Sequence, residues 1–459
     1  MPPAITAPAV TTAAARTPVT FTLGQQLTVI AVCALTAYVA QRAVAVFNDG
    51  VRPFLLDFVR GRSTRGAVAT VSFGLSAGFV FGLGAPLALA TGVLNPWLLF
   101  LPTDVLGLLS PKRWLAALSG AAWGAVVVFG LAGANRLAHK LPVDFVTAMQ
   151  QMATPILYLF TLFPVLAVTR QFGRLSGAVC GVIELALVVT ALKLWPKAFP
   201  GSVAMAAGVL LLTGLAVHRD LVQRRRADRG RAATKQEPRA DRNSDAAPMT
   251  GLFRAGATRL RAHLALFMLL GAGMCLLAST HVYAGGEAGA FLIADGRYGA
   301  AAQVDFYRAL GFIPLIATTA LASGAYGVAG FTLVHPVGYL LPGPWPAAAA
   351  GAATLAAEVT ALSWAGRALG GLPSVRDSSE HLRCAIAQTL DLALLFGSLT
   401  AANAMAGGLG ILLAGGLYLS NEAMGRPVAR MAAAPAAVIS AGVVLNVLSW
   451  LHLFTPAPR

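Results

Sequence analysis

The sequence has few charged residues, and acidic ones are the scarcer of the two signs. Of its 459 residues only 11% are Asp, Glu, Lys or Arg, whereas 57% are hydrophobic. A soluble domain carries roughly a quarter charged residues, so this composition predicts an all-α, polytopic helical membrane protein. The 34 Lys and Arg outnumber 18 Asp and Glu, giving a net charge of +16. Basic loops on the cytoplasmic side explain this excess under the positive-inside rule, so no nucleic-acid partner is expected.

Cysteine clusters and enzymatic motifs are also missing. The four cysteines, Cys33, Cys180, Cys275 and Cys384, each stand alone in an apolar segment without a CxxC spacing. They therefore predict neither a disulfide framework nor a metal site. HExxH, GxSxG, Walker A and dinucleotide-binding patterns do not occur in a suitable context. We expect a protein that is not an enzyme and that holds no cofactor; any transport would be driven by an ion gradient, a solute gradient or a separate partner.

Hydrophobic runs divide the chain into two membrane halves. Residues 1–20 form a Pro/Ala/Thr-rich tail that we expect to be disordered, followed by a first half at 21–217 and a second half at 263–455. Between the halves, residues 218–262 carry twelve Lys/Arg against five Asp/Glu and no apolar run. That composition predicts a flexible cytoplasmic linker. If this linker is cytoplasmic, the other basic loops also fall on the cytoplasmic side along the whole chain. The hydrophobic runs then number about 12–14 segments, some of them broken or re-entrant.

One stretch of the second half is poorly suited to a straight helix. Residues 307–342 are almost wholly apolar, with a single charge at Arg308, and are too long for one crossing but short for two. The interior of the stretch is interrupted by Pro314, Gly324, Gly327, Gly330 and Pro336. We expect a break between residues 322 and 330. Gly/Pro-broken segments of this kind indicate the binding site of a transporter, although a helical hairpin whose small residues allow close packing is an alternative.

A short internal echo points to a repeat. Residues 88–92 read ALATG and residues 320–324 read ALASG; each is preceded by Gly-Phe and followed by Leu-Pro. In the expected topology the two segments start on opposite sides of the membrane, as inverted repeats require. Such matches also arise by chance in a chain rich in Ala, Gly and Leu. Two inverted halves and a chance match therefore both remain open.

Carboxylates in apolar segments are the main candidates for chemistry. Asp104 lies in the apolar run 94–109, and a charge at the centre of a membrane helix costs about 2.5–3.5 kcal/mol. An intramembrane carboxylate can bind a cation or carry a proton, or it can serve as a structural partner for an arginine or a helix end. The candidate solute- or ion-binding residues combine such carboxylates with nearby hydroxyls: Asp104, Thr103, Thr318, Thr319, Ser323, Glu358 and Asp391.

Two polar clusters at the predicted cytoplasmic ends of spans resemble each other. Each places an acid and an arginine beside a proline, and the residues are Asn48, Asp49 and Arg52 in the first and Asn421, Glu422 and Arg426 in the second. This pattern is typical of an inner gate or an anion clamp. It is equally typical of a capped helix end with a snorkelling arginine.

Several longer runs resemble a known family. AVFNDGVRPFL, LNPWLLFLPTDVLG, RALGFIPLIATTALASGAYGVAGFT and NEAMGRPVARMAA are similar to the YhfT family of bacterial inner-membrane proteins. The resemblance extends over about residues 25 to 455 and departs at the N-terminal tail and the basic linker. It implies a multi-pass protein of the bacterial inner membrane and a transporter of unestablished substrate.

These observations predict a secondary-transporter-like permease for a small polar or anionic metabolite. Its site would lie near the membrane midplane, where 94–109 meets 307–342. One alternative is a phosphotransferase-type membrane permease component that needs soluble partners; another is an integral membrane enzyme or scaffold. The expected partners are the solute and the lipid bilayer, and a coupling ion (H⁺ or Na⁺) and a homo-oligomer are compatible with the sequence.

Overall fold

A computed structural model describes nine parts of the chain, namely residues 20–48, 51–59, 61–143, 145–194, 200–234, 246–327, 332–369, 372–428 and 430–456. Nearly all of these residues are helical, which confirms the predicted helical membrane class. Seven helices in these parts are long and apolar enough to cross a membrane, or eight if one bent pair of helices counts as a crossing. Other apolar segments are divided into shorter helices by breaks in the chain.

The first half contains α1 (Leu23–Gln41), α2 (Arg52–Val59), α3 (Arg65–Phe79), the π-helical segment η3 (Val80–Gly84), α4 (Ala85–Thr91), α5 (Pro96–Leu109), α6 (Arg113–Lys140), α7 (Phe145–Gln150), α8 (Ala153–Phe160), α9 (Phe163–Phe172), α10 (Arg174–Leu194) and α11 (Pro200–Thr234). The second half contains α12 (Ala246–Ala262), α13 (Leu264–Ser279), α14 (Glu287–Ala294), α15 (Tyr298–Ser323), α16 (Val334–Leu340), α17 (Pro344–Leu369), α18 (Pro373–Ala423) and α19 (Arg430–Trp450). Two short strands, β1 (Ala45–Val46) and β2 (Tyr326–Gly327), follow α1 and α15.

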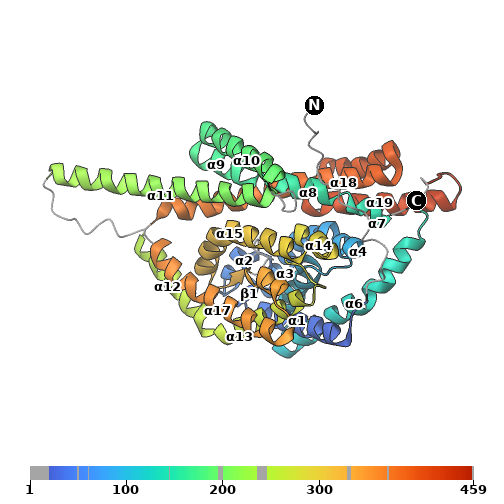
Figure 1. The fold of residues 1–459 in the computed structure, drawn as a ribbon, viewed down its shortest axis with the longest axis horizontal. Helices are drawn as coiled ribbons and strands as arrows, with labels where there is room; N and C mark the ends of the chain where they lie inside the picture. The colour runs from blue at the N-terminus through green and yellow to red at the C-terminus, as the bar shows by residue number, and fades with distance from the viewer. Residues whose placement is uncertain are drawn as a thin grey trace.

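The helices form a body and a layer (Figure 1). The body contains α1–α6 and α12–α17, and the layer of α7–α11, α18 and α19 lies along its upper side in the view. Within the body α1 packs on α6 and α13 packs on α17, and the layer contacts the body where α11 meets α15 and α19 meets α3. Gly271 and Gly351 face each other across α13 and α17, and a Cβ on either glycine would collide with the carbonyl oxygen of the other. Small residues thus allow close helix packing, as is common in membranes.

The stretch 307–342 breaks where the sequence predicts. α15 ends at Ser323, and Gly324 follows in the left-handed conformation (φ 64°, ψ 19°) with its N–H bonded to the Ala320 carbonyl. Glycine adopts this conformation at little cost because it has no Cβ. The strand β2 then replaces the helix, so the predicted break between residues 322 and 330 is confirmed. Residues 328–331 of this segment lie outside the described parts.

This break meets a second break far away in the sequence. β1 and β2 pair in parallel, with Ala45 opposite Tyr326 and Val46 opposite Gly327. The Tyr326 N–H donates to the Val44 carbonyl over 2.9 Å. Backbone groups freed from helices in an apolar environment must be satisfied by protein, and this pairing satisfies some of them.

A matching pair of breaks lies beside the first. Leu94, between α4 and α5, forms a parallel bridge with Tyr283, between α13 and α14. The Leu94 N–H donates to the Val282 carbonyl over 2.7 Å, and the Ala284 N–H donates to the Leu94 carbonyl over 2.9 Å. Four of the breaks in the described chain are therefore joined in two pairs.

The pairings reveal an internal repeat that contains the sequence echo. We call α1–α6 the first repeat and α13–α17 the second repeat. In the first repeat, α4 ends at Gly92, which is left-handed (φ 72°, ψ 5°) with its N–H bonded to the Ala88 carbonyl, as Gly324 is to Ala320. Two residues after each glycine, Leu94 and Tyr326 donate to the other repeat. The first break of each repeat thus pairs with the second break of the other, as a local two-fold relation requires.

Helices extend into the basic segment 218–262 from both sides. α11 continues through its first part to Thr234, and α12 covers its last part from Ala246. α12 is held on the body because Arg259 Nη2 donates to the Ala43 carbonyl over 3.0 Å. Gly256 lies so close to the Leu321 carbonyl oxygen that a Cβ there would collide with it. Residues 235–245, and residues 1–19 of the predicted tail, lie outside the described parts.

Candidate functional site

Asp104 holds the first break of the first repeat. It lies on α5, whose start is fixed by Asn95: the Asn95 Oδ1 accepts the Leu98 N–H over 3.0 Å. Asp104 is fully buried, and its Oδ2 accepts the N–H groups of Phe47 (2.7 Å) and Asn48 (3.0 Å). Two N–H donors stabilise an ionised carboxylate. Asp104 therefore anchors the backbone just after β1.

Thr103 and Asn48 extend this anchor. The Thr103 hydroxyl lies 2.8 Å from the Thr36 hydroxyl on α1 and donates to the Phe100 carbonyl over 2.8 Å. The Asn48 side-chain amide donates to the Ser76 hydroxyl on α3 over 3.2 Å. Two predicted candidates, Asp104 and Thr103, thus lie with the predicted gate residue Asn48 at the same break.

Tyr339 takes the corresponding place in the second repeat. Its hydroxyl accepts the Gly285 N–H over 2.6 Å, just after the Tyr283 bridge, as Asp104 accepts the Phe47 N–H just after β1. The same hydroxyl donates to Asp305 Oδ2 over 2.6 Å. In the second repeat a tyrosine therefore stands between the break and the carboxylate, and both side chains are buried.

Arg308 brings a cation to this carboxylate. It lies one turn after Asp305 on α15, is buried, and its guanidinium carbon lies 5.6 Å from the centre of the Trp97 ring on α5. At Gly286, which precedes α14, a Cβ would collide with Arg308 Nη1 and would lie 2.8 Å from Asp305 Oδ1. The glycine therefore lets both charged groups approach the backbone at the start of α14. A guanidinium on an aromatic face gains a cation–π contribution, which is larger when the pair is removed from water.

A buried row of rings crosses between the repeats. The ring centroids of Phe47 and Phe100 are 4.2 Å apart, those of Phe100 and Tyr283 5.8 Å, and those of Tyr283 and His335 5.5 Å. His335 Nε2 lies 3.2 Å from the Tyr283 hydroxyl. The first repeat contributes the apolar end of the row and the second repeat the polar end.

Glu358 supports the other paired break. From α17, its Oε2 accepts the Tyr326 hydroxyl over 2.5 Å and its Oε1 accepts the Leu333 N–H over 2.8 Å. Ser323 acts locally, since its hydroxyl and the Ala325 N–H are bonded over 3.2 Å. These two predicted candidates therefore lie at β2, where they fix the turn from α15 toward α16.

Of the remaining candidates outside the second predicted gate, the structure describes the side chain of Asp391 alone, and it lies away from the breaks. Asp391 lies half-buried on α18, in the layer (Figure 1). The side chains of Thr318 and Thr319 on α15, and of Arg52 on α2, lie outside the described parts, as does all of Asp49.

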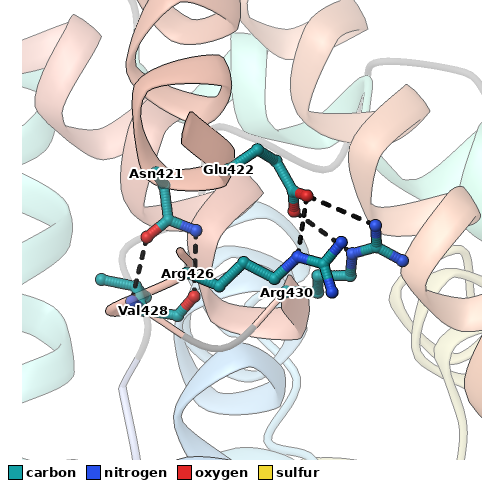
Figure 2. A network of polar contacts seen from close by, with 5 residues as sticks. All are labelled: Asn421, Glu422, Arg426, Val428 and Arg430. Carbon is teal, nitrogen blue, oxygen red and sulfur yellow. Dashed lines mark hydrogen bonds and ion pairs between the residues drawn. The ribbon is translucent and has the colours of Figure 1, made fainter. Parts of the chain in front are cut away.

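The second predicted gate closes the turn between α18 and α19 (Figure 2). The Asn421 amide accepts the Val428 N–H and donates to the Val428 carbonyl, both over 2.9 Å. Glu422 forms ion pairs with Arg426 (2.8 Å) and Arg430 (3.2 Å). Both arginine side chains are about half exposed. The observed contacts are those of a capped helix end.

The polar network of the second repeat was not among the predicted sites. Its side chains are Asp305, Arg308, Tyr283, His335 and Tyr339, and we call them the buried network. A signal was present in the sequence, because Asp305 and Arg308 are three residues apart at the start of an apolar stretch and therefore share a helix face. The tyrosines gave no such signal, since their partners are distant in sequence.

The helices, the breaks and their buried polar contacts define a multi-pass helical membrane protein. The chain belongs to the YhfT family, which matches residues 25–454 and is described as a protein of unknown function. It is 38% identical over 446 residues to the uncharacterized protein YhfT of Escherichia coli (strain K12), covering 94% of this chain and 99% of that protein. The family resemblance seen in the sequence is thereby confirmed. No solved structure matches the chain.

Proposed function

We propose that the protein is a permease of the secondary-transporter type for a small polar solute. One observation carries this proposal: two pairs of broken helices meet inside the body through parallel backbone pairings. Broken helices that meet near the centre of a repeat pair are where transporters bind their solutes. A merely structural bundle gains nothing from four breaks, because every break frees backbone groups that must be satisfied again.

The charge at the breaks supports an anionic solute. Arg308 is buried beside the N-terminal end of α14, where the helix dipole adds positive potential. A guanidinium pairs well with carboxylates and phosphates because its N–H groups form two parallel bonds to them. We therefore infer a small carboxylate or phosphate ester as the solute, with Arg308 as the group that recognises it. The helical, apolar character of the chain supports a place in a bacterial inner membrane.

A ligand screen on purified protein tests the proposal. Small carboxylates and phosphate esters are added singly, and a solute that binds the folded state raises the melting temperature. We expect Arg308→Gln to lose that shift, whereas Arg426→Gln, in the exposed turn of Figure 2, should keep it.

Transport itself is then measured with each stabilising solute in radiolabelled form. Proteoliposomes that contain the protein should accumulate it under an imposed ion gradient, and protein-free vesicles should not. Binding that is unchanged in Arg308→Gln would remove the network from the site, and an absence of uptake for every bound solute would contradict the permease.

A further inference from the structure

The two repeats satisfy equivalent backbone groups in chemically different ways. In the first repeat the carboxylate of Asp104 accepts the Phe47 N–H directly. In the second repeat the hydroxyl of Tyr339 accepts the Gly285 N–H and passes a hydrogen bond on to Asp305. The two contacts can be compared because Phe47 and Gly285 each lie three residues after a carbonyl, of Val44 or Val282, that accepts an N–H from the other repeat.

The difference affects how readily each carboxylate takes up a proton at the oxygen that its printed partner faces. Backbone N–H groups only donate, so a proton on the Asp104 oxygen that faces them would meet two donors and break the contact. A tyrosine hydroxyl both donates and accepts. Tyr339 can therefore donate to an ionised Asp305, or accept a hydrogen bond from a protonated Asp305 while its own O–H turns elsewhere.

Charge couples this proton to the solute. With Asp305 ionised, its negative charge offsets the positive charge of Arg308 beside Gly286. With Asp305 protonated, its negative charge no longer offsets that of Arg308, and the guanidinium attracts an anion more strongly. Tyr339 from α16 and Tyr283 from the segment before α14 also face Asp305, whereas His335 from α16 contacts Tyr283 and faces Arg308.

We propose that Asp305 is the proton-binding group of a proton–anion symport site formed with Arg308 and Tyr339. This inference rests on the proposed transport function and adds its coupling ion. One O–H bond forms at an Asp305 oxygen when a hydronium ion gives up its proton, and the reverse step returns that proton to water on the other side. A monoanion and a proton then cross together without net charge.

The proton half is tested without any solute. Infrared difference spectra of the purified protein between acidic and alkaline buffers report carboxyl groups that gain a proton, through the C=O stretch of the protonated acid. We expect a C=O band that is lost in Asp305→Asn and retained in Asp104→Asn. Tyr339→Phe should keep the band but shift its frequency, because one hydrogen bond to the carboxyl is gone. The Tyr339→Phe shift gives an independent reading should Asp305→Asn fail to fold. A band unchanged in either variant overturns the proposal.

The anion half uses succinate, pyruvate and inorganic phosphate as probes. At least one probe should raise the melting temperature more in acidic than in alkaline buffer, and Asp305→Asn should remove that pH dependence. A pH-independent shift, or no shift with any probe, overturns coupling to an anion. If the C=O band of Asp305 is present but no solute is transported, the permease proposal is contradicted and the proton site is not. If uptake changes neither with pH nor in Asp305→Asn, the proton coupling is contradicted and the permease is not.

Discussion

Gly92 and Gly324 hold equivalent places in the two repeats. Each ends a helix in the left-handed conformation, each bonds its N–H to the carbonyl four residues earlier, and each is followed two residues later by a backbone donor to the other repeat. A pair of matched glycines thus sets where both helices stop and where the repeats join.

Gly324→Ala should destabilise the protein. The left-handed conformation costs a residue with a Cβ about 1–2 kcal/mol, and a Cβ here would also lie 3.2 Å from Arg259 Cδ. We expect a lower unfolding midpoint in detergent. Gly133→Ala, in the middle of α6 with open space around it, is the matched control and should be neutral or slightly stabilising. Equal midpoints for the two variants would show that the left-handed cap is not needed.

Asp104→Asn should weaken the fold more than it alters the site. The amide replaces one carboxylate oxygen by a donor and removes the charge that strengthens the bonds from Phe47 and Asn48. Bonds to a charged group contribute about 1.5–3 kcal/mol, so unfolding should become easier by on the order of 2 kcal/mol. Chemical denaturation of the purified variant measures this. Normal stability together with abolished uptake would instead make Asp104 an ion-binding residue.

The turn of Figure 2 should depend on Asn421 more than on Glu422. Asn421 is buried and makes two bonds to Val428, and a net hydrogen bond contributes about 0.5–1.5 kcal/mol. Asn421→Ala should therefore lower the melting temperature at every salt concentration. Glu422→Gln should have a small effect that fades as salt is added, because solvent screens its exposed ion pairs. The opposite order would favour a gate over a capped turn.

The predicted cytoplasmic side can be checked by labelling. The charge bias of the loops places the segment around Ser244 inside, so Ser244→Cys should resist an impermeant thiol reagent added to intact cells. Cys33, Cys180 and Cys275 are buried and Cys384 is partly exposed, so Cys384 is first replaced by serine. Ready labelling from outside would reverse the orientation of every span.

The breaks were accessible to sequence reasoning because their causes are local. Gly324 ends α15 through its own backbone freedom, and the ALATG and ALASG runs mark both helix ends. The membrane class followed from composition alone. Composition alone did not indicate that α11 and α12 extend into the basic segment 218–262, or that Arg259 and Gly256 of α12 contact the body.

The buried network was not accessible in the same way. Asp104 and Tyr339 correspond to each other only through the pairing of distant breaks. One is an aspartate and the other a tyrosine, so the sequence does not show the correspondence. Asp305 becomes notable once Tyr339 is seen to donate to it. Contacts of this kind depend on how helices far apart in sequence cross, which local propensity does not determine.

The cross-pairing of the breaks also bears on how such a chain can be divided. The Val44 carbonyl accepts an N–H from the second repeat, and the Val282 carbonyl accepts an N–H from the first repeat. Either repeat by itself would leave these carbonyls bare in lipid, at a cost of several kcal/mol for each unsatisfied group. The two repeats therefore depend on each other for backbone hydrogen bonding, and neither is a self-sufficient folding unit in a membrane.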